Sequence, residues 1–138
     1  MIKFVLEVHT IERTVVKEEV SLVNVPTPVE ELTILPGHLP IITTLGYGTL
    51  RYRDAKGEQY LFISGGFMEV ESERVVILAD LIERPEEIDE AEIEAAKKRA
   101  EELRKRKDVD VRSLASAQAD LNVALRKSRV IERHRHRR

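Results

Sequence analysis

The chain has 138 residues, of which 42% are apolar, 35% charged and only 4% aromatic. This length and composition fit one domain with a core of Val, Ile, Leu and Ala, and they argue against a site that stacks a large cofactor on aromatic rings. With 23 basic against 25 acidic side chains and no cysteine, the sequence argues against a surface that binds nucleic acid or anionic lipid throughout, and it excludes disulfides, thiolate metal sites and cysteine nucleophiles.

The N-terminal segment shows no targeting pattern, and no segment has the composition of a membrane span. Met1–Phe4 leads directly into a strand-like pattern, without the basic region and apolar stretch of a signal peptide. The longest uncharged run, Leu32–Leu50, holds two prolines and three glycines, which a lipid-spanning helix would not combine. We therefore expect a protein of the cytosol or of a surface that faces it.

Residues 1–84 predict β-structure, because all six glycines and four of the five prolines fall there, between short runs of apolar and β-branched residues. Strands at this spacing indicate a sandwich or a barrel. The pair Gly65-Gly66, between two such runs, indicates a bulge or a close approach of two backbones. The expected strands are Ile2–Val8, Val15–Val25, Gly48–Arg53, Glu58–Ser64, Phe67–Val70 and Val75–Ala79.

Two of these strands alternate between apolar and polar residues, as is typical of a sheet with one buried and one wet face. We expect the apolar set in the core and the polar set in solvent. The apolar set is Leu50, Tyr52, Tyr60 and Phe62, and the polar set is Arg51, Arg53 and Gln59.

Residues 85–138 predict a helical hairpin, because the segment after Pro85 holds no glycine or further proline and is rich in Ala, Glu, Lys and Arg. The first helix is expected from about Pro85 to Arg106 and the second to about Glu132, with Asp108 or Asp110 as its N-cap. The seam between them should pair Leu114, Ala117, Leu121, Ala124, Leu125, Ser128 and Ile131 with Ala91, Ala95, Ala100 and Leu103.

A seam made largely of alanine buries little area, so we expect a hairpin that can dock and undock. The alternative, two helices simply packed on the β-domain, stays open.

Charge also divides the chain: residues 1–84 carry 8 basic and 13 acidic side chains, and residues 85–138 carry 15 and 12. The cations concentrate near the C-terminus, which suits an acidic protein surface or phosphates, but for residues 133–138 a solvated tail is the favoured interpretation, because chain termini seldom order unaided.

No constellation of catalytic or metal-binding residues is visible. His38 has no nucleophile or orienting partner nearby in the sequence, and His9 lies too far along the chain to suggest a zinc site. His134 and His136 suggest at most a stray metal ion, and no glycine-rich phosphate loop is present. We therefore expect no active site and no metal centre.

Two segments of the β-half stand out as signatures: residues 29–40, VEELTILPGHLP, and residues 64–70, SGGFMEV. The first resembles the G-x-x-G-I-L-P-G-H-x-P segment of the epsilon subunit of F-type ATP synthases, and the second resembles that family's second signature. The strand at Val75–Asp80 and the charged hairpin after it are similar too, so that the resemblance runs from Met1 to Val130. Glu30 and Thr33 stand where the family usually has glycine, so the shape of this loop is expected to differ.

The resemblance implies an α+β fold, in which an N-terminal β-sandwich (residues 1–84) precedes a C-terminal antiparallel two-helix hairpin (residues 85–138). It implies a non-catalytic rotor subunit of the central stalk, at the cytoplasmic face of the membrane, that couples c-ring rotation to ATP synthesis in a proton-translocating enzyme. The implied partners are the gamma subunit, the c ring and the alpha/beta head, with no nucleic acid, membrane insertion, metal or cofactor.

The resemblance also assigns residues. Glu31 and His38 fall at positions that contact the c ring, and the hairpin is expected to inhibit ATP hydrolysis when it extends into the head. The cations suited to acidic segments of the beta subunits are Arg126, Lys127, Arg129 and Arg133.

Some members bind ATP on the folded hairpin through Ile-Asp-x-x-Arg-Ala and later arginines. Ile88 and Asp89 match this motif and Arg99 is a possible later cation, but Glu92 and Ile93 replace its Arg and Ala. Val123 also stands where a further arginine is expected. Because a carboxylate repels a triphosphate, we expect weak or absent ATP binding.

Two other functions stay open. One is a free adaptor whose basic helical arm binds nucleic acid or an anionic membrane, although the second helix has no aromatic residue to stack on bases. The other is an enzyme with a cleft that converges on His38.

Overall fold

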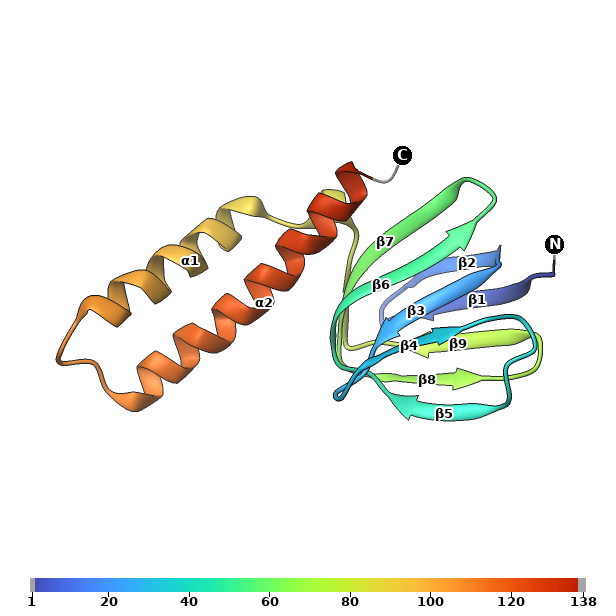
Figure 1. Ribbon diagram of the computed structural model, residues 1–138, viewed down its shortest axis with the longest axis horizontal. Helices are drawn as coiled ribbons and strands as arrows, with labels where there is room; N and C mark the ends of the chain where they lie inside the picture. The colour runs from blue at the N-terminus through green and yellow to red at the C-terminus, as the bar shows by residue number, and fades with distance from the viewer. Residues whose placement is uncertain (1, 137–138) are drawn as a thin grey trace.

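Two five-stranded sheets pack face to face, and a helical hairpin follows them along the chain (Figure 1). The computed structural model describes residues 2–136. The first sheet has the order β2-β1-β9-β8-β5, with β2 Thr14–Val20, β1 Phe4–His9, β9 Arg74–Leu78, β8 Phe67–Val70 and β5 Ile41–Thr44. The second has the order β10-β7-β6-β3-β4, with β10 Leu81–Glu83, β7 Gly57–Ser64, β6 Tyr47–Asp54, β3 Leu22–Pro26 and β4 Glu31–Ile34.

The expected fold class, a β-sandwich followed by two helices, is confirmed. The single strand expected at Val15–Val25 is wrong: β2 belongs to one sheet and β3 to the other, and the chain crosses between them at Ser21. The Ser21 N–H donates to the Arg53 carbonyl at 3.0 Å, which starts the pairing of β3 with β6. One apolar run therefore supplies strands to both layers.

The sequence did not predict three strands, β4, β5 and β10. Each is three or four residues long, and β4 and β5 flank the Pro- and Gly-containing loop of residues 35–40. Such short runs next to turn residues carry too little periodicity to be recognised as strands.

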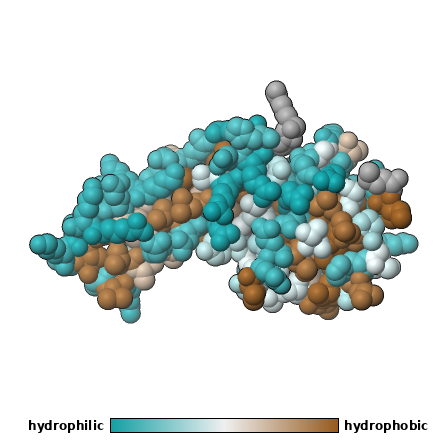
Figure 2. Space-filling model, in the orientation of Figure 1, coloured by the Kyte–Doolittle hydropathy of each residue, from teal (hydrophilic) through white to brown (hydrophobic). Residues whose placement is uncertain are grey.

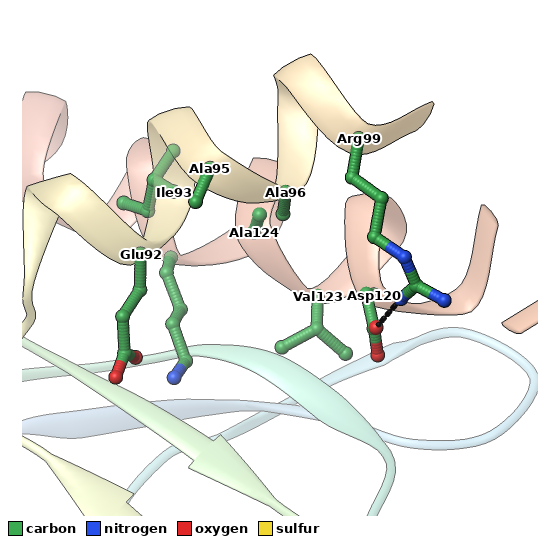
Figure 3. Close-up of a pocket in the computed structure, with 9 residues that line it drawn as sticks. Glu92, Ile93, Ala95, Ala96, Arg99, Asp120, Val123 and Ala124 are labelled. Atoms are coloured by element: carbon green, nitrogen blue, oxygen red, sulfur yellow. Dashed lines mark hydrogen bonds and ion pairs between the residues drawn. The ribbon is translucent and has the colours of Figure 1, made fainter. Parts of the chain in front are cut away.

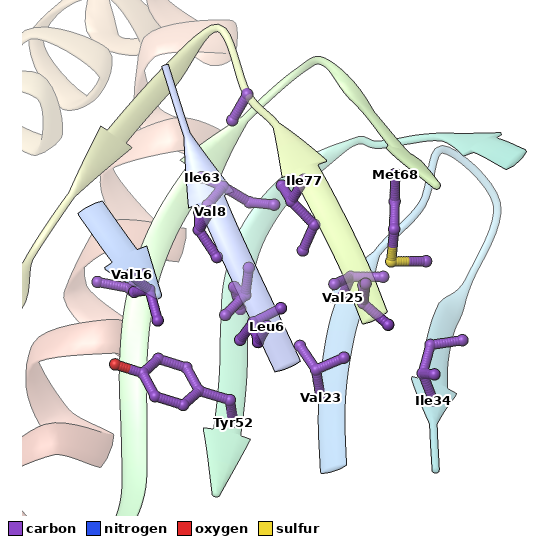
Figure 4. Packing of buried hydrophobic residues seen from close by; sticks show 14 of the residues in the cluster. Leu6, Val8, Val16, Val23, Val25, Ile34, Tyr52, Ile63, Met68 and Ile77 are labelled. Atoms are coloured by element: carbon purple, nitrogen blue, oxygen red, sulfur yellow. The ribbon is translucent and has the colours of Figure 1, made fainter. Parts of the chain in front are cut away.

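The core lies between the sheets and consists of aliphatic side chains (Figure 4). Leu6 and Val8 of β1 and Ile77 of β9 are fully buried against Val23 and Leu50 of the opposite sheet. Burial in β6 alternates as expected, with Leu50 and Tyr52 inside. At about 25 cal/mol per Å² of apolar surface, these side chains provide the main stabilisation of the sandwich.

Gly65 and Gly66 mark a close approach of two backbones, as their sequence position predicted. Gly66 has φ +102°, and a Cβ built there would lie 2.0 Å from the carbonyl oxygen of Leu78. Gly65 has φ +70°, and the Gly65 N–H donates to the Gly46 carbonyl at 3.1 Å. Only glycine combines this backbone conformation with this clearance, which is needed where β8 turns in beside β9.

The helices agree with the sequence except at their ends. Residues Pro85–Glu87 form a single 3₁₀ turn, η1, and α1 spans Glu90–Lys105, so that the expected start at Pro85 is wrong. The carboxylate of Asp89 accepts the Ala91 N–H at 2.9 Å and starts α1 after that turn. Asp110 caps α2, Val111–Arg135, by accepting the Ser113 N–H at 2.7 Å.

The seam of the hairpin is partly as expected. Ala100, Ala117 and Ala124 are buried, but Leu114 and Leu125 are 41% and 43% exposed. Ala91 and Ala95 are also exposed, while Ile93 and Val130 are buried instead. The reason is that α2 packs on two partners, α1 and the strands β6 and β7, so that its buried face is turned between them.

The hairpin docks through its base, and its far half projects beyond the sandwich (Figure 1). Hydrophilic side chains cover much of its visible surface, and apolar ones gather along the groove between the helices and at the tip (Figure 2). None of the helices within residues 2–136 combines the length and apolarity needed to span a membrane.

Candidate functional site

The outer face of the second sheet is covered by α2, and aromatic residues line it. In β7, Leu61 and Ile63 point into the sandwich, whereas Phe62 points outward. Phe62 is nevertheless fully buried, because α2 and the base of α1 cover it. The other buried members of this second cluster are Ile88, Ile93, Ala124, Val130 and Ile131.

The expectation that Tyr60 and Phe62 belong to the core between the sheets is therefore wrong, because both pack in the second cluster. The missed signal is in β7 itself. Residues 60–63, YLFI, run apolar without a break, which is typical of a strand buried on both faces.

Lys127 of α2 is held at the centre of this interface. Its Nζ lies 2.6 Å from Oε1 of Glu83 in β10, and the two side chains are only 16% and 19% exposed. The same Nζ lies 5.3 Å from the ring centre of Phe62, within the range of a cation–π contact. Of the ion pairs among residues 2–136, this is the one that joins α2 to a strand.

Two further cations of α2 lie over tyrosine rings of the sandwich. The Arg126 guanidinium is 5.7 Å from the ring centre of Tyr47, and that of Arg133 is 5.0 Å from that of Tyr60. Each such contact contributes about 0.5–2 kcal/mol, depending on how far water is excluded. Arg129 has no ring or ion-pair partner within residues 2–136, and it borders a hollow of about 330 Å³ beside the loop before β4.

Of the four cations assigned to the beta subunits, three therefore lie on the chain's own sandwich. Sequence reasoning did not identify their partners, Glu83, Tyr47, Tyr60 and Phe62. The residues Lys127 and Glu83 are 44 positions apart, so no local pattern joins them. Of the four cations only Lys127 is largely buried, whereas Arg126, Arg129 and Arg133 stay exposed beside the sandwich.

The junction between sandwich and hairpin is tied down by Glu87. Its carboxylate accepts the Arg84 backbone N–H at 2.8 Å, and both of its oxygens lie 3.2 Å from Nη2 of Arg13, which donates to them. The backbone hydrogen bond and the Arg13 guanidinium lower the pKa of Glu87. The Arg84 guanidinium donates to the Val15 carbonyl at 2.9 Å, so a displaced hairpin would pivot after Glu87.

Glu31 and His38, the residues assigned to the c ring, are not brought together. Glu31 is the exposed first residue of β4, beside the hollow that Arg129 borders. His38 follows the other end of β4, with Nδ1 2.7 Å from the Leu39 carbonyl oxygen. Their roles as ring contacts stay predictions.

Glu30 and Thr33, which stand where the family usually has glycine, show no backbone strain. No residue other than glycine has a positive φ within the described chain, so neither position requires glycine. Thr33 pairs with Asn24 in the sheet, and its hydroxyl accepts the Asn24 amide N–H at 2.7 Å.

The groove between α1 and α2, where the resemblance places a nucleotide, is lined by alanines, Val123 and Ile93 with charged side chains at its ends (Figure 3). It encloses about 390 Å³, with Glu92 at one end and the ion pair of Arg99 with Asp120, 3.0 Å long, at the other. Arg99 is thus neutralised, and the other two proposed nucleotide contacts are engaged elsewhere. Ile88 is buried in the docking cluster, and the Asp89 carboxylate caps α1.

Nothing in the described residues suggests a metal centre or catalytic cluster. Within residues 2–136 no group of three His, Asp or Glu side chains is placed to hold a metal ion. His38 contacts the backbone of its neighbour rather than another titratable side chain. What the geometry offers is a docked helix held by charge and aromatic contacts.

Comparison with known proteins identifies the family. Residues 3–85 match the family described as ATP synthase, Delta/Epsilon chain, beta-sandwich domain. The ATP synthase epsilon chain of Dehalococcoides mccartyi is 43% identical, over 98% of this chain and 96% of that one. That of Herpetosiphon aurantiacus is also 43% identical, over 91% and 88%, and that of Desulforapulum autotrophicum 40%, over 92% and 94%.

A solved structure has the same fold. A chain of the Euglena gracilis mitochondrial ATP synthase, solved as OSCP/F1/c-ring in rotational state 1, superposes with a TM-score of 0.78 at 22% identity, over 92% of this chain and 80% of that one. The relatives match the hairpin as well as the sandwich. On this evidence the chain belongs to the family of ATP synthase epsilon chains.

Proposed function

We propose that this chain is a non-catalytic subunit of the central stalk in a proton-translocating F-type ATP synthase. Its sandwich would bind the gamma subunit and the c ring and transmit rotation, and its hairpin would inhibit ATP hydrolysis. The observation that carries this proposal is the 43% identity to an epsilon chain over 98% of the sequence, hairpin included. Peripheral attachment at the cytoplasmic face of the membrane follows from that assembly.

The docked hairpin supports an inhibitory role, because it is a separable element. Its contacts with the strands come from one face of α2, centred on a cluster around Phe62. Once undocked, Arg126, Lys127, Arg129 and Arg133 would be free to pair with acidic segments of the beta subunits. The contact with the head therefore requires the hairpin to leave the sandwich.

Glu31 and His38 are proposed as contacts to the polar loops of the c ring. Glu31 is exposed where the chain enters β4, and His38 lies in the loop that follows, with Nδ1 in contact with the Leu39 carbonyl oxygen. Glu31 begins β4 and His38 lies in the loop after that strand, and both are positioned by the sandwich, which suits a contact that must carry torque.

We also propose that the hairpin works without a bound nucleotide. Glu92 and Asp120 place two carboxylates in the groove, and Asp120 already pairs with Arg99. Isothermal titration calorimetry of the purified chain with Mg-ATP should give no heat of binding below millimolar concentration. Micromolar binding would overturn this proposal. The double variant Glu92→Arg with Asp120→Ala, which removes both carboxylates from the groove and adds a cation, should bind Mg-ATP more tightly than the parent.

The function is tested by assembly. The chain is co-expressed with the gamma, alpha and beta subunits of its source, and ATP hydrolysis is compared with and without residues 85–138. Co-purification together with faster hydrolysis after truncation is the expected result. Failure to co-purify would exclude the central-stalk role, and an unchanged rate would exclude the inhibitory role alone.

A further inference from the structure

The folded hairpin needs a source of stability that its alanine seam does not supply. Alanine side chains contribute little apolar burial, and Leu114 and Leu125, which would add to the seam, are largely exposed. The ion pairs that join the two helices, Arg99 with Asp120 and Arg135 with Glu90, are largely exposed and therefore contribute little. The remaining candidate is the contact between α2 and the sandwich.

Lys127 is the most constrained charge in that contact. Its ammonium group lies 2.6 Å from the Glu83 carboxylate and 5.3 Å from the Phe62 ring centre, and both ionic side chains are mostly buried. Removing either partner leaves the other charge mostly buried without its counter-charge, which costs more than the loss of an exposed pair. Breaking an exposed pair of the hairpin, such as Lys105 with Glu101, costs little stability, because water solvates both charges.

We propose that Glu83, Phe62 and Lys127 form a latch that holds the hairpin in its folded state, and that this latch competes with inhibition because Lys127 serves both. The second half of this inference rests on the proposed function. The first half concerns the isolated chain alone. Arg126 over Tyr47 and Arg133 over Tyr60 extend the same competition to two more cations.

The competition has a specific consequence for mutants. Glu83→Gln removes the counter-charge but leaves every cation of α2 intact, so the hairpin is released with its inhibitory surface complete. Lys127→Ala releases the hairpin as well, but it also removes one of the cations. The two variants should therefore agree in how far they open the hairpin and differ in how far they inhibit the enzyme.

The latch is tested in the full-length isolated chain. Because the sequence has no cysteine, spin labels can be placed at Lys56→Cys in the sandwich and Lys107→Cys at the hairpin tip, both exposed positions. Pulsed electron paramagnetic resonance should give one narrow distance distribution for the parent. Glu83→Gln should add a second population and shift the closed-to-open ratio about tenfold, equivalent to about 1.4 kcal/mol.

Matched controls separate a latch from general damage. Glu12→Gln, an exposed carboxylate on another loop, should leave the distribution unchanged, and circular dichroism should report equal helix content for all variants. The exchange variant Glu83→Lys with Lys127→Glu should return the distribution towards the closed state. A distribution for Glu83→Gln that matches the parent overturns the latch, as does an exchange variant that stays as open as Lys127→Ala.

A second readout, in the assembled complex, keeps the two proposals apart. Glu83→Gln should inhibit ATP hydrolysis more than the parent, and Lys127→Ala less than Glu83→Gln. Opening in the isolated chain with no change of hydrolysis in either variant would contradict the inhibitory function and leave the latch intact. No opening, whatever the hydrolysis rate, would contradict the latch.

Discussion

At the scale of single residues, the stability of the sandwich is most sensitive to positions where the backbone conformation and the packing admit only glycine. Gly66 illustrates this, because its φ of +102° and its clearance from Leu78 are both incompatible with a side chain. Gly57 has φ +114° but open space around it. A side chain at Gly57 would meet only the unfavourable backbone conformation, whereas one at Gly66 would also collide with Leu78.

Gly66→Ala should therefore destabilise the sandwich far more than Gly57→Ala. We expect a loss of about 3 kcal/mol in the free energy of unfolding for Gly66→Ala, from strain and displaced packing together. Gly57→Ala should cost about 1–2 kcal/mol, from conformation alone. Urea denaturation of both variants measures the difference, and equal losses would show that the contact with Leu78 relaxes freely.

Glu87 gives a prediction on pH dependence. The Arg84 N–H and the Arg13 guanidinium hold the pKa of Glu87 below its ordinary value. A carboxylate with a depressed pKa in the folded state stabilises the protein above its unfolded pKa, and this contribution is lost as pH falls through the folded pKa. Thermal melts of Glu87→Gln and the parent should differ at pH 7, and the difference should shrink as pH falls below the ordinary carboxyl pKa of about 4.3 and vanish below the lower folded pKa. A difference that is constant across this range would show that the charge of Glu87 does not contribute.

At the scale of elements, α2 is stabilised by its docked half. Val130, near the C-terminal end of α2, is fully buried in the cluster around Phe62, whereas Val111, at the other end of the same helix, is 84% exposed. Val130→Ala should lower the stability of the docked hairpin by about 1.5–2 kcal/mol, because about two methylene equivalents of burial are lost. Val111→Ala should change it by less than about 0.5 kcal/mol. Thermal unfolding followed by the helical dichroism signal checks both, and equal effects would contradict docking through the C-terminal half of α2.

The sequence predicted the elements better than their arrangement. The helices were recognisable because capping residues and the absence of Gly and Pro act locally, and the errors lie at their ends, at the 3₁₀ turn Pro85–Glu87 and at the end of α2, Arg135. The division of Val15–Val25 into β2 and β3 was not recognisable, since it depends on which sheet each half joins. The face that α2 turns inward was likewise set by its second partner, the sandwich. The same limit hid the pairing of Lys127 with Glu83, which only the docked arrangement brings together.

At the scale of the whole molecule, two separate hydrophobic clusters stabilise the sandwich and the docked hairpin respectively. The core between the sheets is built entirely from residues of the sandwich, and the second cluster joins Phe62 to the hairpin. The sandwich therefore has its own core, whereas the docked position of the hairpin depends on the sandwich. Stability is expected to be uneven, with the hairpin at the lower end.

A chain of residues 1–84 should accordingly fold cooperatively, but it should expose the aromatic face that α2 now covers. Phe62 and Tyr60 would form a new apolar patch, and such patches promote association. We expect a single thermal transition, binding of a hydrophobic dye, and self-association detectable by analytical ultracentrifugation. Phe62→Ser in the same truncated chain should suppress dye binding and association while leaving the transition in place, because Phe62 does not belong to the core between the sheets. Loss of the cooperative transition on truncation would show instead that the two clusters fold as one unit, and a hairpin released in the full chain would then carry part of the sandwich with it.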